Sequence, residues 1–383
     1  MRRLAYSLAA TLSTFMWGIY FSFTRRYLAV ELAGGTRAVL LITGLEWLYV
    51  FFAVLASRLG EVLGGRNLVR LSSLGFLPLL MATLLRDPYT LALVLSVTSL
   101  TWSISWPVIL SAVFSSPKGG YGWAYSLFTL GTGLGWSAGS IAMGFIHSAG
   151  GPVLVFTACS LLYILSYLIF SEFYPREVEL PPRAPRGGFG EVRRLWYIFI
   201  PYTLLVLSRE LYYSVAPVKL SLELAKLLKD YSESLQYIAF GVAYGGITAV
   251  LSIPTRFICG KLADRYSPLL LLATSSFTYL ASYWGFVLTE GLLSIAIWQL
   301  PLYPLVDTAV NVGLARYTSG GSRTAALGAS LAFSALGGLA VLPLTASPKL
   351  GPELVGTLIT ATLVASVALT TYYYRRYADQ PRA

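Results

Sequence analysis

Apolar runs of about 20 residues recur from one end of the chain to the other, and they limit the fold more than any other feature. A helix of this length spans the hydrocarbon core of a membrane, which is about 30 Å thick. Inside that core every backbone N–H and C=O must be bonded internally, so a run must form a helix or a strand of a closed barrel. The runs do not alternate in polarity as barrel strands do, which leaves the helix.

Twelve such runs are present, so we predict an all-α integral membrane protein with twelve transmembrane helices. Composition agrees, because 12% of the 383 residues are charged against roughly 25% in soluble domains. The first run is too long for a signal peptide and lacks a cleavage site, so we expect a retained helix. The predicted helices begin near Leu4, Thr36, Leu68, Tyr89, Tyr121, Pro152, Leu195, Leu235, Pro268, Leu292, Arg323 and Pro352.

Lys and Arg concentrate in alternate loops. With an inner N-terminus, nineteen fall on the inner side, Arg256 among them, and eight on the outer side, including Arg25 and Arg26. This asymmetry is what the positive-inside rule requires. The net charge of +11 therefore reports orientation in a lipid bilayer and implies no nucleic-acid partner. We expect a multi-pass protein of the plasma membrane with both termini in the cytoplasm.

Two landmarks repeat at a single offset. SRLGEVLGGR, residues 57–66, follows the same plan as GKLADR, residues 260–265, at an offset of 203, and Gly135 and Gly338 are also 203 apart. A shared offset favours two duplicated halves of six helices, as in transporters built from parallel repeats. We predict a six-helix bundle over 1–174, a Pro-, Gly- and Arg-rich cytoplasmic linker over 175–194, and a second bundle over 195–383 around a central cavity.

Six plus six helices, a basic central loop and the two loops just described resemble the major facilitator superfamily. The resemblance covers nearly the whole chain and implies a transporter whose halves rock about a central site. It also implies that a loop carboxylate faces the positive end of a helix in the other half while the inner side is closed. We expect Glu61 near Arg323 and Asp264 at the start of the fifth helix. The gating residues implied are Arg58, Glu61, Gly260, Asp264, Arg265 and Arg323.

The fifth predicted helix carries glycines four residues apart. This pattern resembles a motif of the family's antiporters, although Trp136 stands where that motif has Pro. This resemblance favours export. The fourth helix has no Arg between Thr98 and Trp106, where the family's proton-linked drug exporters usually carry one. Small residues at this spacing also let helices pack closely in lipid. We predict helix packing through Gly131, Gly135, Gly139, Gly337 and Gly338.

Charged residues inside predicted helices mark the functional site. Glu46, Arg209, Glu210 and Asp307 each cost at least about 2.5–3.5 kcal/mol at the bilayer centre, so such residues usually face a cavity or a partner. The three acids are candidate proton sites. An alternative is an internal ion pair, for example between Arg209 and Asp307, that never meets substrate.

The first, fourth, seventh and tenth helices line the central cavity in the family that the chain resembles. Residues four apart share a helix face, which groups Tyr303, Asp307 and Asn311. We predict an aromatic-lined substrate pocket near the midplane. Its residues are Trp17, Tyr20, Trp102, Trp106, Tyr202, Arg209, Glu210, Tyr303, Asp307 and Asn311.

Other function classes lack the residues they need. A primary pump would need a GxxxxGK[ST] loop, and an enzyme would need a nucleophile paired with a base, so we expect neither, and no cofactor or metal. Cys159 and Cys259 fall within helices, which argues against a disulfide. We predict a monomeric secondary transporter that exports a small organic solute by alternating access, with protons as the candidate coupling ion. Alternatives are an importer or facilitator of a metabolite such as a sugar or an organic anion, and a receptor or scaffold that does not transport.

Overall fold

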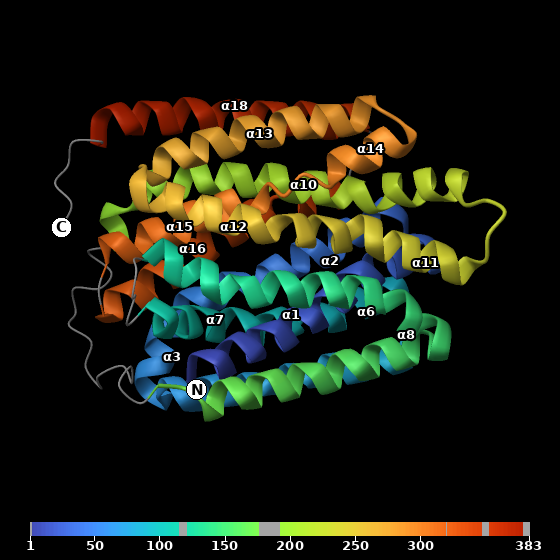
Figure 1. Cartoon of the computed structure of the whole chain (residues 1–383), viewed down its shortest axis with the longest axis horizontal. Helices are drawn as coiled ribbons and strands as arrows, with labels where there is room; N and C mark the ends of the chain where they lie inside the picture. The colour runs from blue at the N-terminus through green and yellow to red at the C-terminus, as the bar shows by residue number, and fades with distance from the viewer. Residues whose placement is uncertain (1, 115–120, 176–191, 319, 347–351, 378–383) are drawn as a thin grey trace.

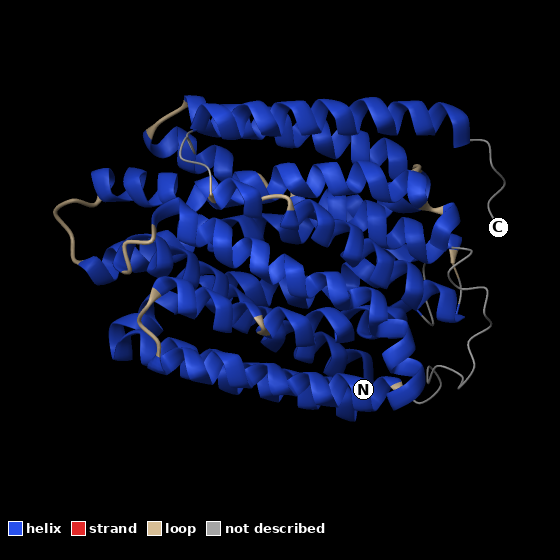
Figure 2. Cartoon of the chain, turned by 180° about the vertical axis from the view of Figure 1, so that it is seen from behind, coloured by secondary structure: helices blue, strands red, loops and turns tan. Residues whose placement is uncertain are grey.

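The computed structural model describes residues 2–114, 121–175, 192–318, 320–346 and 352–377. All regular structure in these ranges is helical (Figure 2). α1 (Arg2–Arg26) begins at the end of the molecule where α18 (Pro352–Tyr377) ends (Figure 1). We call this the termini end and the opposite one the far end. Most of the predicted linker, residues 176–191, lies outside the described ranges.

Twelve helical segments separated by loops or sharp breaks run through the described ranges, each starting within three residues of its predicted position. They are α1; α2 (Gly35–Val50) with α3 (Ala56–Leu63); α4 (Gly65–Leu71) with α5 (Phe76–Met81); α6 (Pro88–Ser96) with α7 (Thr98–Phe114); the two parts of α8 (Tyr121–Glu172); α10 (Trp196–Leu227); α11 (Glu233–Gly241) with α12 (Ile247–Arg265); α13 (Pro268–Leu288); α14 (Gly291–Trp298) with α15 (Tyr303–Tyr317); α16 (Gly320–Leu339) with α17 (Leu342–Thr345); and α18.

Local sequence sets where several helices start and turn. Asp87 accepts a 2.7 Å hydrogen bond from the backbone N–H of Thr90 and is followed by Pro88, which together start α6. Ser267 and Pro268 start α13 in the same way. α8 is broken at Gly151, whose φ of 61° suits glycine. The chain reverses there, so α8 forms two of the twelve segments (Figure 1).

Eight helical segments of the described ranges are long and apolar enough to cross a membrane. Large apolar side chains such as Leu84, Leu161 and Phe277 remain exposed on the outside of the bundle, where lipid tails would cover them. Inside the bundle, many Ser and Thr hydroxyls donate to a carbonyl three or four residues earlier, as Thr24 does to Tyr20 and Ser214 to Glu210. This satisfies hydroxyls that have no water to bind.

The helices up to α8 gather on one side of the molecule and most of those from α10 onward on the other (Figure 1). Contacts between the two sets include α12 against α8 and α16 against α2. The segment from Gly291 to Tyr317 is interrupted between Trp298 and Tyr303, where the sequence contains Pro301. Gln299 stabilises this break, because its Nε2 donates to the carbonyl of Ala243 at 2.8 Å.

The glycine stripe of α8 packs against α1. A Cβ built on Gly131, Gly135 or Gly139 would collide with Thr11 or Phe15 of α1 or their neighbours, so the predicted packing role is present in the geometry. In the other half Gly337 lies against Thr203 of α10, whereas Gly338 lies against Trp47 of α2. Gly337 therefore packs on the first helix of its half, as the glycines of α8 do, whereas Gly338 packs on a helix of the other half.

Candidate functional site

Arg209 joins two carboxylates between α10 and α15. Its Nε donates to Oε1 of Glu210 at 3.0 Å, and its Nη1 lies 3.7 Å from Oδ1 of Asp307. The guanidinium also lies 5.9 Å from the ring centre of Trp47 on α2. The sequence left open which acid Arg209 pairs with, and the structure pairs it with both.

Asp307 is the most accessible member of this cluster. Its side chain is 37% exposed, against 12% for Arg209 and 9% for Glu210. Buried Tyr125 and Tyr202 are close enough to interact with its charge. A carboxylate that a small molecule can reach inside a ring of buried side chains is placed to exchange a proton or to meet a solute.

The predicted stripe of Tyr303, Asp307 and Asn311 lies along α15, and its members reach three helices. The Tyr303 hydroxyl accepts a 3.0 Å hydrogen bond from Arg256 on α12, and Asp307 pairs with Arg209 on α10. Asn311 donates to the hydroxyl of Tyr125 on α8 at 3.1 Å. One face of α15 therefore contacts polar groups of both sets of helices.

Arg25 is not a loop residue, which corrects the expectation from charge asymmetry. It lies in α1, is 4% exposed and donates to Oε1 of Glu46 at 3.1 Å, with a second contact to Oε2. The Tyr20 hydroxyl donates to the same Oε1 at 2.7 Å. α1 continues through Arg26 into a π-helical turn, Tyr27–Glu31, so the helix includes Arg25 and Arg26, which were expected in the loop after it. Glu46 is thus a buried carboxylate with a cationic partner.

Arg256 is a second correction, because it was counted as an inner-loop residue. It lies in the middle of α12 and is 9% exposed. Its Nη1 donates to Thr132 of α8 at 3.1 Å and its Nε to Ser252 at 3.3 Å. Sequence reasoning missed Arg25 and Arg256. Each is separated from apolar helical sequence by no more than about one to two helical turns, and this could have indicated that the side chain lies inside the bundle.

Aromatic side chains form a wall on the α1 and α7 side. Trp17 lies edge-on to Tyr20 at 5.1 Å and to Trp102 at 6.4 Å, and Trp102 stacks on Trp106 at 5.7 Å. The structure therefore brings together the four aromatic residues predicted from this half. The indole Nε1 of Trp17 is buried and has no hydrogen-bond partner among the described residues. Across the molecule, buried Tyr202 and half-buried Tyr213 lie near Arg209.

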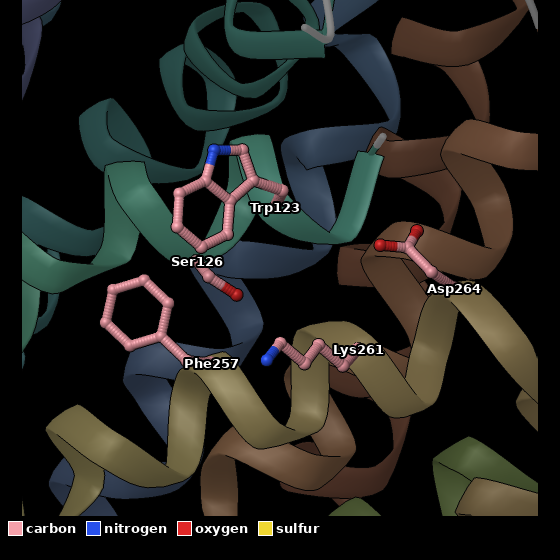
Figure 3. Close-up of a pocket in the computed structure, with 5 residues that line it drawn as sticks. All are labelled: Trp123, Ser126, Phe257, Lys261 and Asp264. Carbon is pink, nitrogen blue, oxygen red and sulfur yellow. The ribbon is translucent and has the colours of Figure 1, made fainter. Parts of the chain in front are cut away.

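At the termini end, Asp264 makes the contact expected of it. Its Oδ1 accepts a 3.0 Å hydrogen bond from the backbone N–H of Gly122, at the start of α8, and lies 3.8 Å from Arg316. Gly260 packs against Gly122 so closely that neither could carry a side chain. Figure 3 shows the hollow beside this contact, about 250 Å³ in volume, with Trp123 and Ser126 on α8 facing Phe257, Lys261 and Asp264 on α12.

Glu61 and Arg323 form no ion pair within the described ranges, although α3 and α16 are in contact, so their closeness stays a prediction. Arg323 instead donates to the carbonyl of Phe114 at 2.8 Å and to the hydroxyl of Tyr121 at 3.1 Å. Both acceptors lie where α7 ends and α8 begins. The negative end of the α7 dipole supplies the partner that Glu61 was expected to supply. Arg58 and Arg265 are exposed to solvent.

Contacts also close the far end. The guanidinium of Arg26 on α1 lies 4.1 Å from the ring centre of Tyr237 on α11, and the ring of His147 on α8 lies 4.3 Å from the same tyrosine. A cavity of about 30 Å³ lies beside Tyr213, Tyr279 and Tyr303, which has room for one or two water molecules. The larger hollow near Asp264 is lined by none of the buried charged side chains, so we place the candidate site by the charges.

Comparisons with known proteins agree with this architecture. The family model described as Major Facilitator Superfamily matches residues 6–342. A crystal structure of a mutant of the peptide transporter POT has a TM-score of 0.70 at 12% identity, over 97% of this chain and 94% of that one. A structure of a mutant of the nucleoside transporter NupG has a TM-score of 0.68 at 14% identity, over 98% of this chain and 100% of that one.

At these identities the two structures show the fold alone. No curated protein matches the sequence. The family model, however, spans most of the chain and fits both the helix order and the buried polar interior described above. The protein therefore belongs to the major facilitator superfamily, whose members are secondary transporters of small solutes.

Proposed function

We propose that the protein carries a small organic solute across the cell membrane by alternating access, with Asp307 as the site that couples transport to protons. The observation that carries this proposal is the arrangement of Arg209 between Glu210 and Asp307. A proton on Asp307 would remove one carboxylate from Arg209 and free part of its guanidinium for a solute. The termini end would face the cytoplasm, as the positive-inside rule favours.

Movement between the halves accounts for access from either side. The contacts of Asp264 with Gly122 and of Arg323 with Phe114 would hold the termini end shut. The contact of Arg26 with Tyr237 would do the same at the far end. Opening either end would break the contacts of that end, and a solute bound between the two ends would shift the balance between the states open at each end. The bundles over 1–174 and 195–383 are the proposed moving units.

Export was expected from the glycine stripe, but the packing of that stripe on α1 accounts for it without any direction of transport. Uptake of an organic anion is the second candidate, and the observation in its favour is Arg256, a buried cation whose hydrogen-bond partners are neutral hydroxyl groups. A receptor that does not transport is the third candidate and predicts no solute flux.

Flux into proteoliposomes tests these alternatives. The full chain is reconstituted, and labelled glucose, gluconate and tetraphenylphosphonium represent a sugar, an organic anion and a lipophilic cation. We expect one class to accumulate when a pH gradient is imposed, and the gradient's sign gives the direction. Accumulation that Asp307→Asn leaves unchanged at every pH would contradict the coupling role. Flux equal to that of protein-free liposomes for every class would favour the receptor.

A further inference from the structure

Arg256 has a chemical environment unlike that of the other arginines around the central site. Arg25 contacts the carboxylate of Glu46, and Arg209 contacts those of Glu210 and Asp307. No carboxylate oxygen of the described ranges lies within 4.0 Å of the Arg256 guanidinium. A buried charge is costly unless it is paired, so an anion that neutralised Arg256 would be stabilised there.

We propose that Arg256 is an anion-binding residue of the central site and receives the carboxylate of a small organic monoanion. The proposal rests on the transport function proposed above and names the class of solute. Arg323 shows how an arginine of this fold is held when no ligand is needed. Among the described residues it too pairs with no acid, but its terminal nitrogens donate to backbone carbonyls of Phe114 and Thr318, and the carbonyls at the end of α7 carry the negative end of the helix dipole. Arg256 has only the hydroxyls of Thr132, Ser252 and Tyr303.

The hydrogen-bonding capacity of Arg256 is only partly used. A guanidinium has five N–H donors, and three bonds are formed, one each from Nε, Nη1 and Nη2. One donor therefore remains on each terminal nitrogen. Two parallel donors on one guanidinium match the two oxygens of a carboxylate. The Tyr303 ring, 5.3 Å from the guanidinium carbon, supports the side chain from one side.

The position of Arg256 suits a solute site. Thr132 lies on α8, whereas Ser252 and Tyr303 lie on α12 and α15, so the guanidinium bridges the two sets of helices. If α8 moves away from α12, the bond to Thr132 breaks and exposes Nη1. Tyr303 also borders the cavity of about 30 Å³. Expansion of this space on opening would place a small ligand against Arg256.

Neighbouring charges limit the ligand to a single negative charge. Asp307 lies one turn from Tyr303 on the same face of α15, and its charge acts on Arg256 without direct contact. Arg209, Arg256, Glu210 and Asp307 together have no net charge. A bound monoanion makes the cluster −1, which one proton restores to neutral, whereas a dianion would leave an uncompensated buried charge.

Thermal unfolding of the full chain in detergent tests the proposal. The probes are acetate, lactate, gluconate and benzoate, each compared with its neutral amide. A carboxylate that binds only the folded protein stabilises it by RT ln(1 + [L]/Kd), so Tm rises with the logarithm of its concentration above Kd. We expect at least one acid to raise Tm and its amide to have no effect. If no acid does so, or if each amide acts equally, the proposal is wrong.

Variants locate the binding. Arg256→Gln should weaken binding of the effective acid about 10- to 100-fold, because it removes a charge-assisted pair of hydrogen bonds. Arg256→Lys should restore part of the affinity, and Arg70→Gln, which changes an exposed arginine on α4, should behave as the parent protein. Size-exclusion elution and unliganded Tm establish that each variant folds. If Arg256→Gln does not fold, the comparison of Arg256→Lys with the parent protein decides: unchanged affinity would overturn the proposal.

The result is separable from that of the proposed function. Solute flux that depends on Asp307 but is unchanged in Arg256→Gln would overturn the anion site and leave proton-coupled transport standing. Acid binding that depends on Arg256 in a protein without flux would support the anion site and contradict transport.

Discussion

Asp264 accepts a 3.0 Å hydrogen bond from the backbone N–H of Gly122 and thereby joins the end of α12 to the start of α8. The N–H groups of a first helical turn have no partner inside their own helix. A carboxylate satisfies one of them and also lies at the positive end of the helix dipole. The bond exists only while α8 and α12 are in contact at the termini end, which is why we propose Asp264 as a gate residue.

Replacing Asp264 by Asn should slow turnover and leave solute affinity largely unchanged. The change removes the charge but keeps the shape, so we expect the balance between closed and open termini end to shift about two- to fivefold, from a charge–dipole energy of about 0.3–1 kcal/mol. Exchange flux in proteoliposomes gives turnover, and ligand-dependent Tm gives affinity. Asp230→Asn, at an exposed position beyond α10, is the matched control. Abolished affinity in a folded Asp264→Asn protein would argue against a gate.

Replacing Arg323 by Gln should open the termini end more often. The variant loses charge-assisted bonds to the Phe114 carbonyl and the Tyr121 hydroxyl. The native thiol of Cys259, 3% exposed and next to Gly260 on α12, reports the opening. Maleimide labelling of Cys259 should become severalfold faster, while Cys159, buried against α1, should stay unlabelled. Equal labelling rates in parent and variant would show that Arg323 does not hold this end shut.

The fold could be predicted from sequence because its signal is repeated along the chain. Each apolar run must form a helix in a bilayer, and Gly or Pro marks several boundaries, as at Gly151 and Pro268. The acid–glycine contact of Asp264 could also be anticipated, since it uses a loop and a helix start that sequence places well. The partner of Arg323 could not be anticipated, because it is a backbone carbonyl. Every residue has such a group, so the sequence does not mark which one Arg323 contacts.

The central site was predictable only in part. The stripe from Tyr303 to Asn311 follows from helical spacing, and Arg209, Glu210 and Asp307 from their position in apolar runs. Arg25 was assigned to a loop because it lies at the end of α1, and Arg256 because the predicted helix was taken to end before it, whereas α12 continues to Arg265. Whether such an arginine is buried depends on a partner helix, namely α2 for Arg25 and α8 for Arg256.

Removing one member of the Arg25–Glu46 pair should destabilise the protein strongly. An unpaired charge left inside a protein costs about 3–5 kcal/mol, whereas replacing both partners with apolar residues is often neutral. We therefore expect a large fall in Tm for Glu46→Leu and for Arg25→Met, and a Tm near the parent value for Arg25→Met with Glu46→Leu. If the destabilisation of the double variant equals the sum of the destabilisations of the two single variants, the two residues do not act through their ion pair.

Lys219 should stabilise the turn between α13 and α14 at the far end. Its Nζ donates to the carbonyls of Phe286, Val287 and Thr289 at 2.7, 2.9 and 2.7 Å. These are carbonyls of the last turn of α13 and its cap, which have no partner within the helix. Lys219→Met should cost about 1.5–3 kcal/mol, the range for hydrogen bonds to a charged group, and lower Tm. Lys229→Met, an exposed lysine beyond α10, should leave Tm unchanged.

Replacing Asp307 by Asn should separate solute exchange from solute accumulation. The amide keeps the size of the side chain and its position beside Arg209, but it carries no charge and cannot exchange a proton. If Asp307 couples the proton, net accumulation driven by a pH gradient should be lost, while exchange between labelled and unlabelled solute at equal pH should continue. Affinity for an anion at Arg256 should stay the same or rise, because the variant no longer has the negative charge of Asp307, which acts on Arg256. Glu210→Gln is the matched control, since it removes the other acid bound to Arg209; if it abolishes accumulation and Asp307→Asn does not, the proton site is Glu210.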